Sequence, residues 1–391
     1  MRSISIFGAT GSVGRQTAAL IAHQGGAEAY RIAALTAQSD VAGLADMARQ
    51  LRAEEAVIAD PAHLADLRDA LAGTDTRASA GPQALIDAAA RGADWTMCAI
   101  VGVAGLAPTL ASAQAGGTIA LANKESMVCA GDLVKAAMAK AGGTLLPVDS
   151  EHSAIFQALA GHERPARIIL TASGGPFRRW DRAAMAEVTV EQAVAHPNWS
   201  MGRKISIDSA SMFNKGLEML EAMTLFDLRA DQVDVVVHPQ SIVHSLVEFA
   251  DGAQLAHLGP TDMAGPIGYA LNWPARRALP LPRLDLAALG SLSFEPPDPD
   301  RFPALRLARQ AMEAGGLMGA VLNGAKEKAL DAFLDRRCGF LEMAELVEAA
   351  LDALSHWAGE TSLDVGLAGV TEADLAARRA VDQRLDETRT R

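Results

Sequence analysis

The first 148 residues alternate short β-forming runs with stretches of helical periodicity, and this alternation constrains the fold more than any other feature of the sequence. The expected strands are Ile4–Phe7, Ile32–Leu35, Ala56–Ala59, Trp95–Ile100, Thr118–Leu121 and Leu145–Val148. Strands that alternate with helices form parallel sheets covered on both faces. The sequence therefore predicts an α/β protein with a parallel sheet over residues 1–149.

The rest of the chain has a different pattern, and 391 residues exceed what one core holds, since single cores stop growing at roughly 250–300 residues. Strands at 167–171 and 233–237 and a hairpin with Asp251-Gly252 at its turn predict a central α+β domain over 150–273. The proline-rich stretch 274–303 predicts a linker, because proline removes backbone donors. Helical periodicity predicts a C-terminal helical bundle over 304–391.

The charge balance is acidic, with 47 Asp and Glu against 35 Lys and Arg and a net charge of −12. Proteins that bind nucleic acid present basic surfaces to the phosphate backbone, so we expect no nucleic-acid partner. The three cysteines are widely spaced and have no metal-ligand spacing. We expect reduced thiols in a cytoplasmic protein: Cys98, Cys129 and Cys338.

One stretch is long and uncharged enough to span a bilayer, from Trp95 to Asn123. Its glycines, Pro108 and polar residues favour a strand, a helix and a strand of a buried α/β unit instead, so we expect no membrane partner. A strand begins at Ser3, which leaves no room for a targeting peptide.

A glycine-rich string, Gly8-Ala9-Thr10-Gly11-Ser12-Val13-Gly14, follows the first expected strand and opens a helix. Glycines there permit a tight turn and let a pyrophosphate approach the backbone and the helix N-terminus. The spacing is GxxGxxG rather than GxGxxG, and a merely structural turn is the alternative. The position between strand and helix favours a dinucleotide site in a Rossmann-like domain.

Two carboxylates, Asp149 and Glu151, follow the last strand of the sheet, where ligands of open α/β sheets bind. In an extended segment they would point to the same side and could share one cation. Alone, the pair fits a solvated loop or a helix cap better.

A second acidic segment changes that balance. Residues 208–221 have helical periodicity, and Asn214 and Lys215 lie four and three residues before Glu218. A surface Lys–Glu pair is the ordinary interpretation. However, Gly216 costs about 1 kcal/mol inside a helix, which indicates that another group approaches closely.

Together these carboxylates, Asp149, Glu151 and Glu218, offer three oxygen ligands without a cysteine, which suits Mg²⁺ or Mn²⁺ rather than zinc. The lysine and amide donors beside Glu218 suit a phosphate.

A long loop is expected from Ser173 to Lys204. Loops longer than about 12–15 residues are commonly lids or disordered, and glycines near both ends could act as hinges. Trp199 and Met201 favour a lid that covers a substrate.

The sequence resembles the 1-deoxy-D-xylulose 5-phosphate reductoisomerase family in strings that span both expected catalytic domains: GATGSVG, LANKES, PVDSEH, ASGGPF, HPNWSMGRKISIDSASMFNKGLE and HPQSIVHS. The resemblance implies rearrangement of a ketose phosphate and its reduction by NADPH to 2-C-methyl-D-erythritol 4-phosphate, with Mn²⁺ or Mg²⁺ as a Lewis acid, in isoprenoid biosynthesis.

The resemblance also implies roles for individual residues. Metal ligands would be Asp149, Glu151 and Glu218, with Lys124 and His152 as further catalytic residues and His244 lining the site. Substrate would contact Ser150, Ser173, His196, Trp199, Ser209, Asn214 and Lys215. Cofactor would contact Thr10, Gly11, Ser12, Val13, Gln38, Asn123, Lys124, Glu125 and Gly202.

Two departures from the family pattern stand out. A basic residue and an asparagine are typical near positions 39 and 40, where this chain has Ser39-Asp40, so preference for NADPH over NADH should be weaker. Asp40 is expected to cap the following helix. The second departure is Asn323-Gly324-Ala325-Lys326-Glu327 in place of Asn-Ala-Ala-Asn-Glu, which we attribute to packing.

Two other functions remain as alternatives. A semialdehyde-type dehydrogenase would need a nucleophilic cysteine, for which Cys129 is the candidate, without a recognisable base nearby. A nucleotide-sensing Rossmann protein would not need the convergent carboxylates. A homodimer is expected by default, since such enzymes are commonly symmetric.

Overall fold

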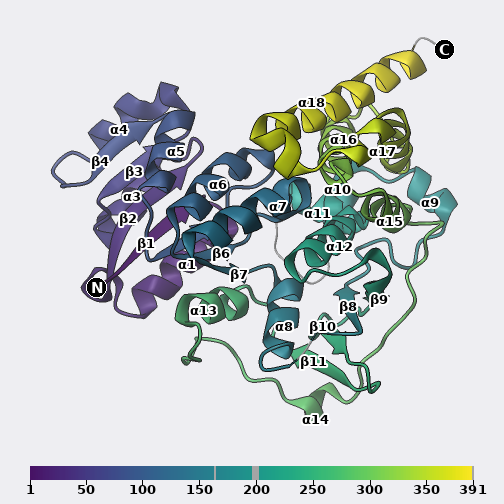
Figure 1. Cartoon of the computed structure of the whole chain (residues 1–391), viewed down its shortest axis with the longest axis horizontal. Helices are drawn as coiled ribbons and strands as arrows, with labels where there is room; N and C mark the ends of the chain where they lie inside the picture. Colours follow the sequence, from purple (N-terminus) through teal and green to yellow (C-terminus); the bar gives the residue numbers. More distant parts are fainter. Residues whose placement is uncertain (163, 196–201, 390–391) are drawn as a thin grey trace. The chain divides into compact units, whose positions relative to one another are not determined.

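The computed structural model describes residues 1–162, 164–195 and 202–389, and the chain divides into two compact units (Figure 1). The first unit contains Met1–Ser126, Val134–Ser153 and Asp262–Pro282. The second contains Met127–Leu133, Ala154–Thr261 and Arg283–Arg391. Each unit therefore combines segments that are far apart in the sequence.

The first unit is built on a seven-stranded parallel sheet in the order β4-β3-β2-β1-β5-β6-β7. The strands are β1 Arg2–Phe7, β2 Tyr30–Ala37, β3 Glu55–Ile58, β4 Arg77–Ala80, β5 Trp95–Cys98, β6 Thr118–Leu121 and β7 Thr144–Pro147. The strand order reverses between β1 and β5, and ligands of open α/β sheets bind at such a switch point. This topology confirms the expected α/β class and Rossmann-like sheet.

Helices connect the strands of this sheet: α1 Ser12–His23, α2 Gly26–Ala29, α3 Val41–Leu51, α4 Leu64–Ala70, α5 Pro82–Ala90, α6 Leu106–Ala115 and α7 Lys124–Ala141. Helix α8 Ser150–Ala158 follows the last strand and enters the second unit at Ala154. The uncharged stretch that could have spanned a bilayer forms β5, α6 and β6. In the described part of the chain, no helix combines the length and the apolar character that crossing a membrane requires.

A late segment completes the first unit. Helix α13 (Ala264–Asn272) packs on α1, β6 and β7. The buried indole of Trp95 donates to the Ala270 carbonyl at 3.0 Å, and Arg2 donates to the Leu271 carbonyl at 2.6 Å. The domain boundary expected at residue 273 falls inside this segment.

The second unit contains a four-stranded sheet in the order β11-β10-β8-β9. Its strands are β8 Arg167–Ala172, β9 Val233–Val237, β10 Val243–Glu248 and β11 Gln254–Leu258. Strands β10 and β11 pair antiparallel, and Asp251 and Gly252 form the turn, as the sequence predicts.

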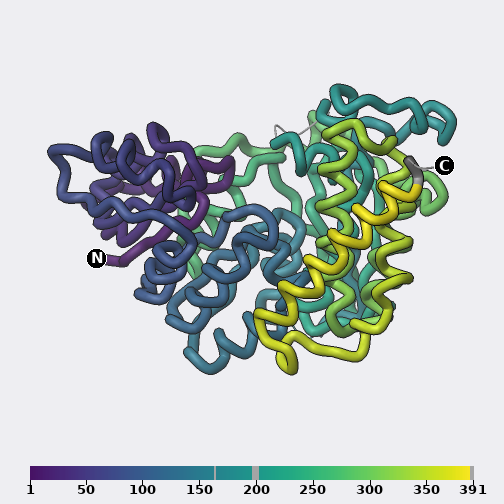
Figure 2. Tube along the Cα trace, turned by 90° about the horizontal axis from the view of Figure 1, so that it is seen from above, coloured from purple at the N-terminus to yellow at the C-terminus, as the bar shows by residue number. Residues whose placement is uncertain are grey.

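Helices make up most of the remaining second unit: α9 Arg182–Ala186, α10 Val190–Ala193, α11 Arg203–Ala210, α12 Phe213–Leu225, α14 Leu286–Leu289, α15 Ala304–Ala314, α16 Met318–Leu334, α17 Glu342–Ala353 and α18 Ser362–Arg389. Figure 2 shows α18, in yellow, running alongside the other C-terminal helices. A Cβ on Gly324 of α16 would lie 2.4 Å from the Asp374 carbonyl of α18, so glycine permits this close packing.

Several sequence expectations were wrong in detail. Strand β4 was not expected at all. The loop after β8 contains the short helices α9 and α10, and the proline-rich stretch contains α14. The single helix expected over 208–221 is two helices, α11 and α12, separated at Met212, which has a left-handed φ of 66°.

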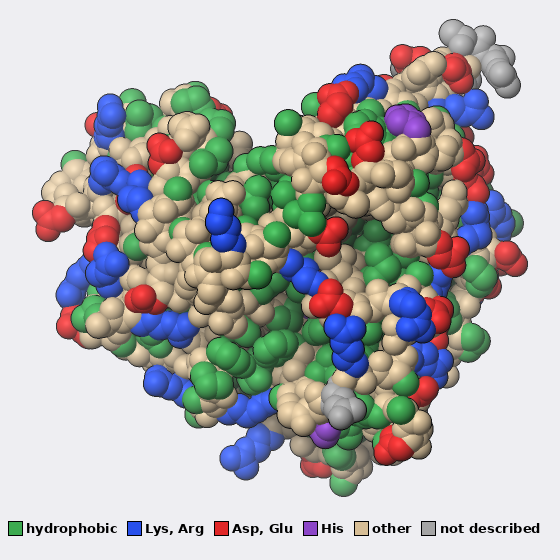
Figure 3. Space-filling view, viewed as in Figure 1, with side chains coloured by type: hydrophobic (Ala, Val, Ile, Leu, Met, Phe, Trp, Pro, Cys, Tyr) green, Lys and Arg blue, Asp and Glu red, His purple; other side chains and the backbone are tan. Residues whose placement is uncertain are grey.

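On the face shown in Figure 3, Lys and Arg side chains are interspersed with Asp and Glu. That face of the described residues therefore presents no extended basic stripe of the kind that follows a phosphate backbone.

Candidate active site

The glycine-rich turn joins β1 to α1 and needs its glycines. Gly8 has a φ of 87°, and a Cβ there would lie 2.5 Å from the Ala99 carbonyl at the end of β5. A Cβ on Gly14 would lie 2.2 Å from the Gly8 carbonyl. Gly11 is the N-cap of α1 and has no side-chain cap, so the first N–H groups of this helix are available to an anion. The turn has the form of a pyrophosphate site.

Asn123 fixes the loop between β6 and α7. Its side chain accepts from the Ser126 N–H at 3.0 Å and donates to the Ile100 carbonyl at 2.7 Å and to Glu125 at 2.7 Å. These bonds connect the carboxyl ends of β5 and β6, the strands beside the switch point. These hydrogen bonds also fix the backbone at Lys124, the first residue of α7.

Lys124 and Asp149 form a buried ion pair in the first unit. The Lys124 ammonium lies 2.6 Å from Asp149 Oδ2, and the side chains are 8% and 15% exposed. Asp149 follows β7, and the fully buried ring of His152 lies 3.8 Å from the same carboxylate oxygen. The structure therefore brings Lys124, Asp149 and His152 together in the first unit.

The expected geometry of the carboxylate pair was wrong. The chain is not extended here, because β7 ends at Pro147 and α8 begins at Ser150. Glu151 lies in the first helical turn and accepts from the Ser150 hydroxyl, and the Ser150 N–H donates to Asp149 at 3.0 Å. Local bonds through Ser150, rather than strand alternation, orient the two carboxylates.

The second unit presents Asn214, Lys215 and Glu218 on α12. Glu218 accepts from both the Asn214 amide and the Lys215 ammonium. Lys215 and Glu218 are only 4% and 1% exposed, so the ordinary interpretation of a surface ion pair is wrong. Burying charges costs several kcal/mol per ion unless they are well paired, and such pairs are found at functional sites.

Gly216 explains how α12 can be buried so deeply. A Cβ there would lie 3.2 Å from the Ala304 carbonyl and 3.2 Å from Ala308 Cβ of α15. The group whose close approach was inferred from the sequence is thus helix α15. It packs on the face of α12 that points away from Glu218.

Ser173 follows β8 and lies near α11. The Gly175 N–H donates to the Ser173 hydroxyl at 3.2 Å, and Gly175 has a φ of 65°. A Cβ on Gly175 would be 3.0 Å from the Ser209 carbonyl, so the glycine turn lets the loop after β8 approach the end of α11. The two serines expected at a phosphate therefore lie on neighbouring segments.

The remaining site residues have simpler positions. His244 is a buried residue of β10, with its ring 5.7 Å from that of His257. Gly202, expected near the cofactor, is the N-cap of α11 in the second unit, and Gln38 is an exposed residue after β2. The lid residues His196, Trp199 and Met201 lie outside the described residues.

A buried charge cluster between α11 and α16 was not predicted from the sequence. The Lys326 ammonium is 3.0 Å from Asp208 Oδ2 and 2.8 Å from Glu327 Oε1, and its side chain is 1% exposed. Burial alone would raise the pKa of Glu327, but the charge and hydrogen bond of Lys326, with Lys204 and Arg378 nearby, lower it to about 2. Lys326, which departs from the family pattern, therefore forms an ion pair with α11, the helix that carries Ser209. Its role is not limited to packing.

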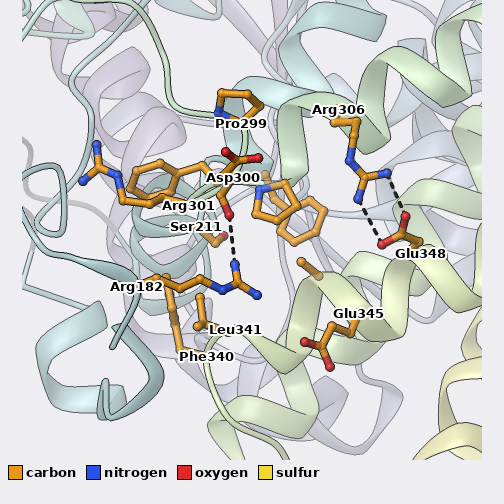
Figure 4. A pocket seen from close by; sticks show the side chains of 14 residues that line it. Arg182, Ser211, Pro299, Asp300, Arg301, Arg306, Phe340, Leu341, Glu345 and Glu348 are labelled. Atoms are coloured by element: carbon orange, nitrogen blue, oxygen red, sulfur yellow. Dashed lines mark hydrogen bonds and ion pairs between the residues drawn. The ribbon is translucent and has the colours of Figure 1, made fainter. Parts of the chain in front are cut away.

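A pocket of about 400 Å³ elsewhere in the second unit does not share these groups (Figure 4). Its cations are engaged by the chain itself: Arg306 pairs with Glu348, and Arg182 donates to the Asp300 carbonyl at 2.9 Å. None of the candidate site residues that the structure describes lines this pocket.

Comparison with known proteins gives one consistent answer. Family models described as 1-deoxy-D-xylulose 5-phosphate reductoisomerase, its C-terminal domain and the DXP reductoisomerase C-terminal domain match residues 4–131, 145–226 and 258–380. The 1-deoxy-D-xylulose 5-phosphate reductoisomerase of Ruegeria pomeroyi is 56% identical over 384 residues, which is 98% of this chain and 97% of the relative. That of Paracoccus denitrificans is 57% identical over 385 residues, 98% and 99% of the two chains.

Solved structures agree with the sequence matches. The Zymomonas mobilis enzyme in complex with NADPH has a TM-score of 0.91 and 48% identity, covering 98% of this chain and 99% of that one. A DOX-P reductoisomerase in complex with NADPH, fosmidomycin and magnesium has a TM-score of 0.95 and 42% identity, covering 100% and 99%. With both catalytic domains matched from end to end, the dehydrogenase and nucleotide-sensor alternatives are excluded, and the chain belongs to the 1-deoxy-D-xylulose 5-phosphate reductoisomerase family.

Proposed function

We propose that the protein converts 1-deoxy-D-xylulose 5-phosphate to 2-C-methyl-D-erythritol 4-phosphate, by a metal-dependent rearrangement followed by NADPH-dependent reduction, in non-mevalonate isoprenoid biosynthesis. The observation that carries the proposal is the buried Lys124–Asp149 pair at the carboxyl end of β7. It puts an ammonium and a potential metal ligand at the edge of the sheet where α/β proteins bind cofactors.

Asp149, Glu151 and Glu218 are the proposed ligands of Mg²⁺ or Mn²⁺. All three offer carboxylate oxygens, which these cations prefer, and the chain offers no cysteine beside them. When bound, the metal would supply Lewis-acid stabilisation of enolate-like charge and NADPH would supply the hydride.

The protein side chains have distinct proposed tasks. Lys124 holds Asp149 in place and donates to the reacting oxygens of the substrate, and Ser150 binds the same oxygens. Four donors, Ser173, Ser209, Asn214 and Lys215, bind the phosphate, and the segment with His196, Trp199 and Met201 covers it. The turn at Thr10–Val13, with Asn123 and Glu125, binds the cofactor.

The direct test follows NADPH oxidation at 340 nm with the ketose phosphate as substrate. We expect turnover with Mg²⁺ or Mn²⁺ and none with excess EDTA, because the ammonium groups of Lys124 and Lys215 are single charges that cannot chelate adjacent substrate oxygens as a divalent metal ion would. Turnover that survives complete chelation would contradict the proposal.

Lys215→Ala is expected to raise the KM for the phosphorylated substrate by about 10- to 100-fold, because a charge-assisted contact is worth roughly 1.5–3 kcal/mol. Binding of a dephosphorylated analogue should change much less. Steady-state kinetics with both compounds measure the difference. Lys328→Ala is the matched control: Lys328 of α16 pairs with Asp382 of α18 at 2.7 Å, and its loss should leave KM unchanged. Equal effects on both compounds would place Lys215 away from the phosphate.

We also propose a homodimer in the cytoplasm. Strand β11 is an edge of its sheet and exposes Leu255 and Leu258, and exposed edges favour pairing with another chain. Among the described residues no disulfide joins Cys98, Cys129 or Cys338, which fits a reducing compartment. Light scattering coupled to gel filtration would measure the mass, and a monomer at micromolar concentration would contradict the dimer.

A further inference from the structure

The end of β2 carries no cation of its own in this chain. Rossmann proteins that bind NADPH use a basic residue here to contact the 2′-phosphate of the adenosine ribose. The corresponding residues are Gln38, Ser39 and Asp40. Asp40 caps α3 as the sequence predicts, since its Oδ1 accepts from the Gly43 N–H at 2.9 Å.

A cation reaches this place from another element. Arg15, in the first turn of α1, extends to Asp40, and its Nη2 lies 2.7 Å from Oδ2 of that carboxylate. Its Nε donates to the Thr10 carbonyl in the glycine-rich turn at 2.8 Å. The guanidinium is therefore held between the proposed pyrophosphate turn and the end of β2.

Two features support the stability of this arrangement, and a third makes it accessible to a ligand. Strands β1 and β2 are parallel neighbours, and the Ala9 N–H donates to the Thr36 carbonyl at 2.7 Å, which brings the two turns side by side. A Cβ on Gly43 would lie 2.9 Å from Arg15 Nη2 and 2.4 Å from Asp40 Oδ2, so glycine leaves room for the pair. The Arg15 and Asp40 side chains are 54% and 42% exposed, so a ligand can reach them.

We propose that Arg15 is the residue that binds the 2′-phosphate and confers preference for NADPH, in place of the basic residue absent from positions 38–40. A guanidinium has five N–H donors in a planar fork, so bonds to Thr10 and Asp40 leave donors for a phosphate. The same contact offsets the negative charge of Asp40, which would otherwise repel the ligand. Ser39 and Gln38 add neutral donors.

The opposing interpretation is an ordinary surface ion pair, which contributes only about 0–1 kcal/mol to stability and nothing to cofactor choice. The two interpretations differ in what loss of Arg15 does to NADPH and NADH separately. Because an exposed pair contributes little to folding, the variants needed for the test should remain folded.

The experiment measures the dissociation constants of NADPH and NADH by calorimetry in wild type and in Arg15→Gln. We expect Arg15→Gln to weaken NADPH binding about 10- to 100-fold and NADH binding less than about 2-fold, as the loss of charge-assisted hydrogen bonds predicts. Arg31→Gln on β2 removes a similar exposed pair, in which Arg31 lies 2.9 Å from Glu54, and should change neither constant. Equal effects on both cofactors, or none on either, would overturn the proposal.

A double variant separates direct contact from charge neutralisation. If Arg15 contacts the phosphate, Arg15→Gln with Asp40→Asn should stay weak for NADPH. Recovery of wild-type binding would show that Arg15 only neutralises Asp40 and would overturn the direct contact. The inference rests on the proposed use of NADPH: a wild-type protein that binds neither cofactor contradicts that function, whereas NADPH preference that survives Arg15→Gln contradicts this inference alone.

Discussion

Glu218→Gln is expected to lower kcat at least 100-fold, the largest effect of any conservative change in the proposed site. Glu218 is 1% exposed and accepts from both Asn214 and Lys215. The glutamine keeps the shape but loses the charge, and its amide nitrogen would face donors. The change therefore removes a proposed metal ligand and leaves Lys215 without its anion.

Two measurements test this expectation. Turnover is followed during titration with Mn²⁺, and Mn²⁺ affinity is measured independently by electron paramagnetic resonance. The control is Glu348→Gln, which removes a surface carboxylate that pairs with Arg306 at 2.7 Å and should leave both readouts unchanged. Retention of more than a fifth of the activity with unaltered Mn²⁺ affinity would remove Glu218 from the metal site.

Lys326→Met should reduce the free energy of unfolding by about 3–5 kcal/mol, because loss of one partner from a buried charge cluster leaves the others uncompensated. The ammonium of Lys326 lies between Asp208 on α11 and Glu327 on α16, at 3.0 and 2.8 Å. Methionine fills a similar volume, so the effect reports charge rather than a cavity. Urea denaturation, followed through the unfolding transition of the second unit, measures this change in the free energy of unfolding.

The control is Lys328→Met, which breaks the partly exposed pair with Asp382 and should cost less than about 1 kcal/mol. Adding Asp208→Asn and Glu327→Gln to Lys326→Met removes the uncompensated charges and should restore most of the lost stability. A single variant as stable as wild type would show that the cluster is not electrostatically coupled.

The same cluster predicts an acid dependence. The pKa of Glu327 is about 2 in the folded protein, below its ordinary value. A lowered pKa contributes stability that is present above the unfolded value near 4.5 and is lost as the pH falls toward 2. In Lys326→Met this acid-induced loss should be smaller, because the main cause of the lowering is gone and burial, which raises the pKa of Glu327, remains.

Strands with strong β propensity could be predicted from the sequence, and strand β4 is the exception. Strand β4 consists of Arg77, Ala78, Ser79 and Ala80, without a β-branched or aromatic residue, and its side chains are partly exposed. Neither propensity nor a hydrophobic run identifies such an edge strand. Its neighbour β3, with Val57 and Ile58 fully buried, was identified.

Candidate site residues could be predicted where they stand in short sequence motifs. The spatial arrangement of these residues could not be predicted. The left-handed conformation of Met212 depends on packing around it, so the break between α11 and α12 has no local signal. Lys326 meets Asp208 across 118 residues of sequence, and Arg15 meets Asp40 across 25. Contacts between residues so far apart become visible only in the fold.

The contribution of α13 to the first unit has a consequence for synthesis on the ribosome and for fragment expression. Residues 1–153 contain the whole seven-stranded sheet but lack the carbonyl of Ala270 that accepts from Trp95, and they lack the helix that covers α1. A nascent chain therefore cannot finish its nucleotide-binding half until residue 282 has emerged, well after much of the other unit has been translated. An expression fragment of that half should join residues 1–153 to 262–282 through a short artificial linker.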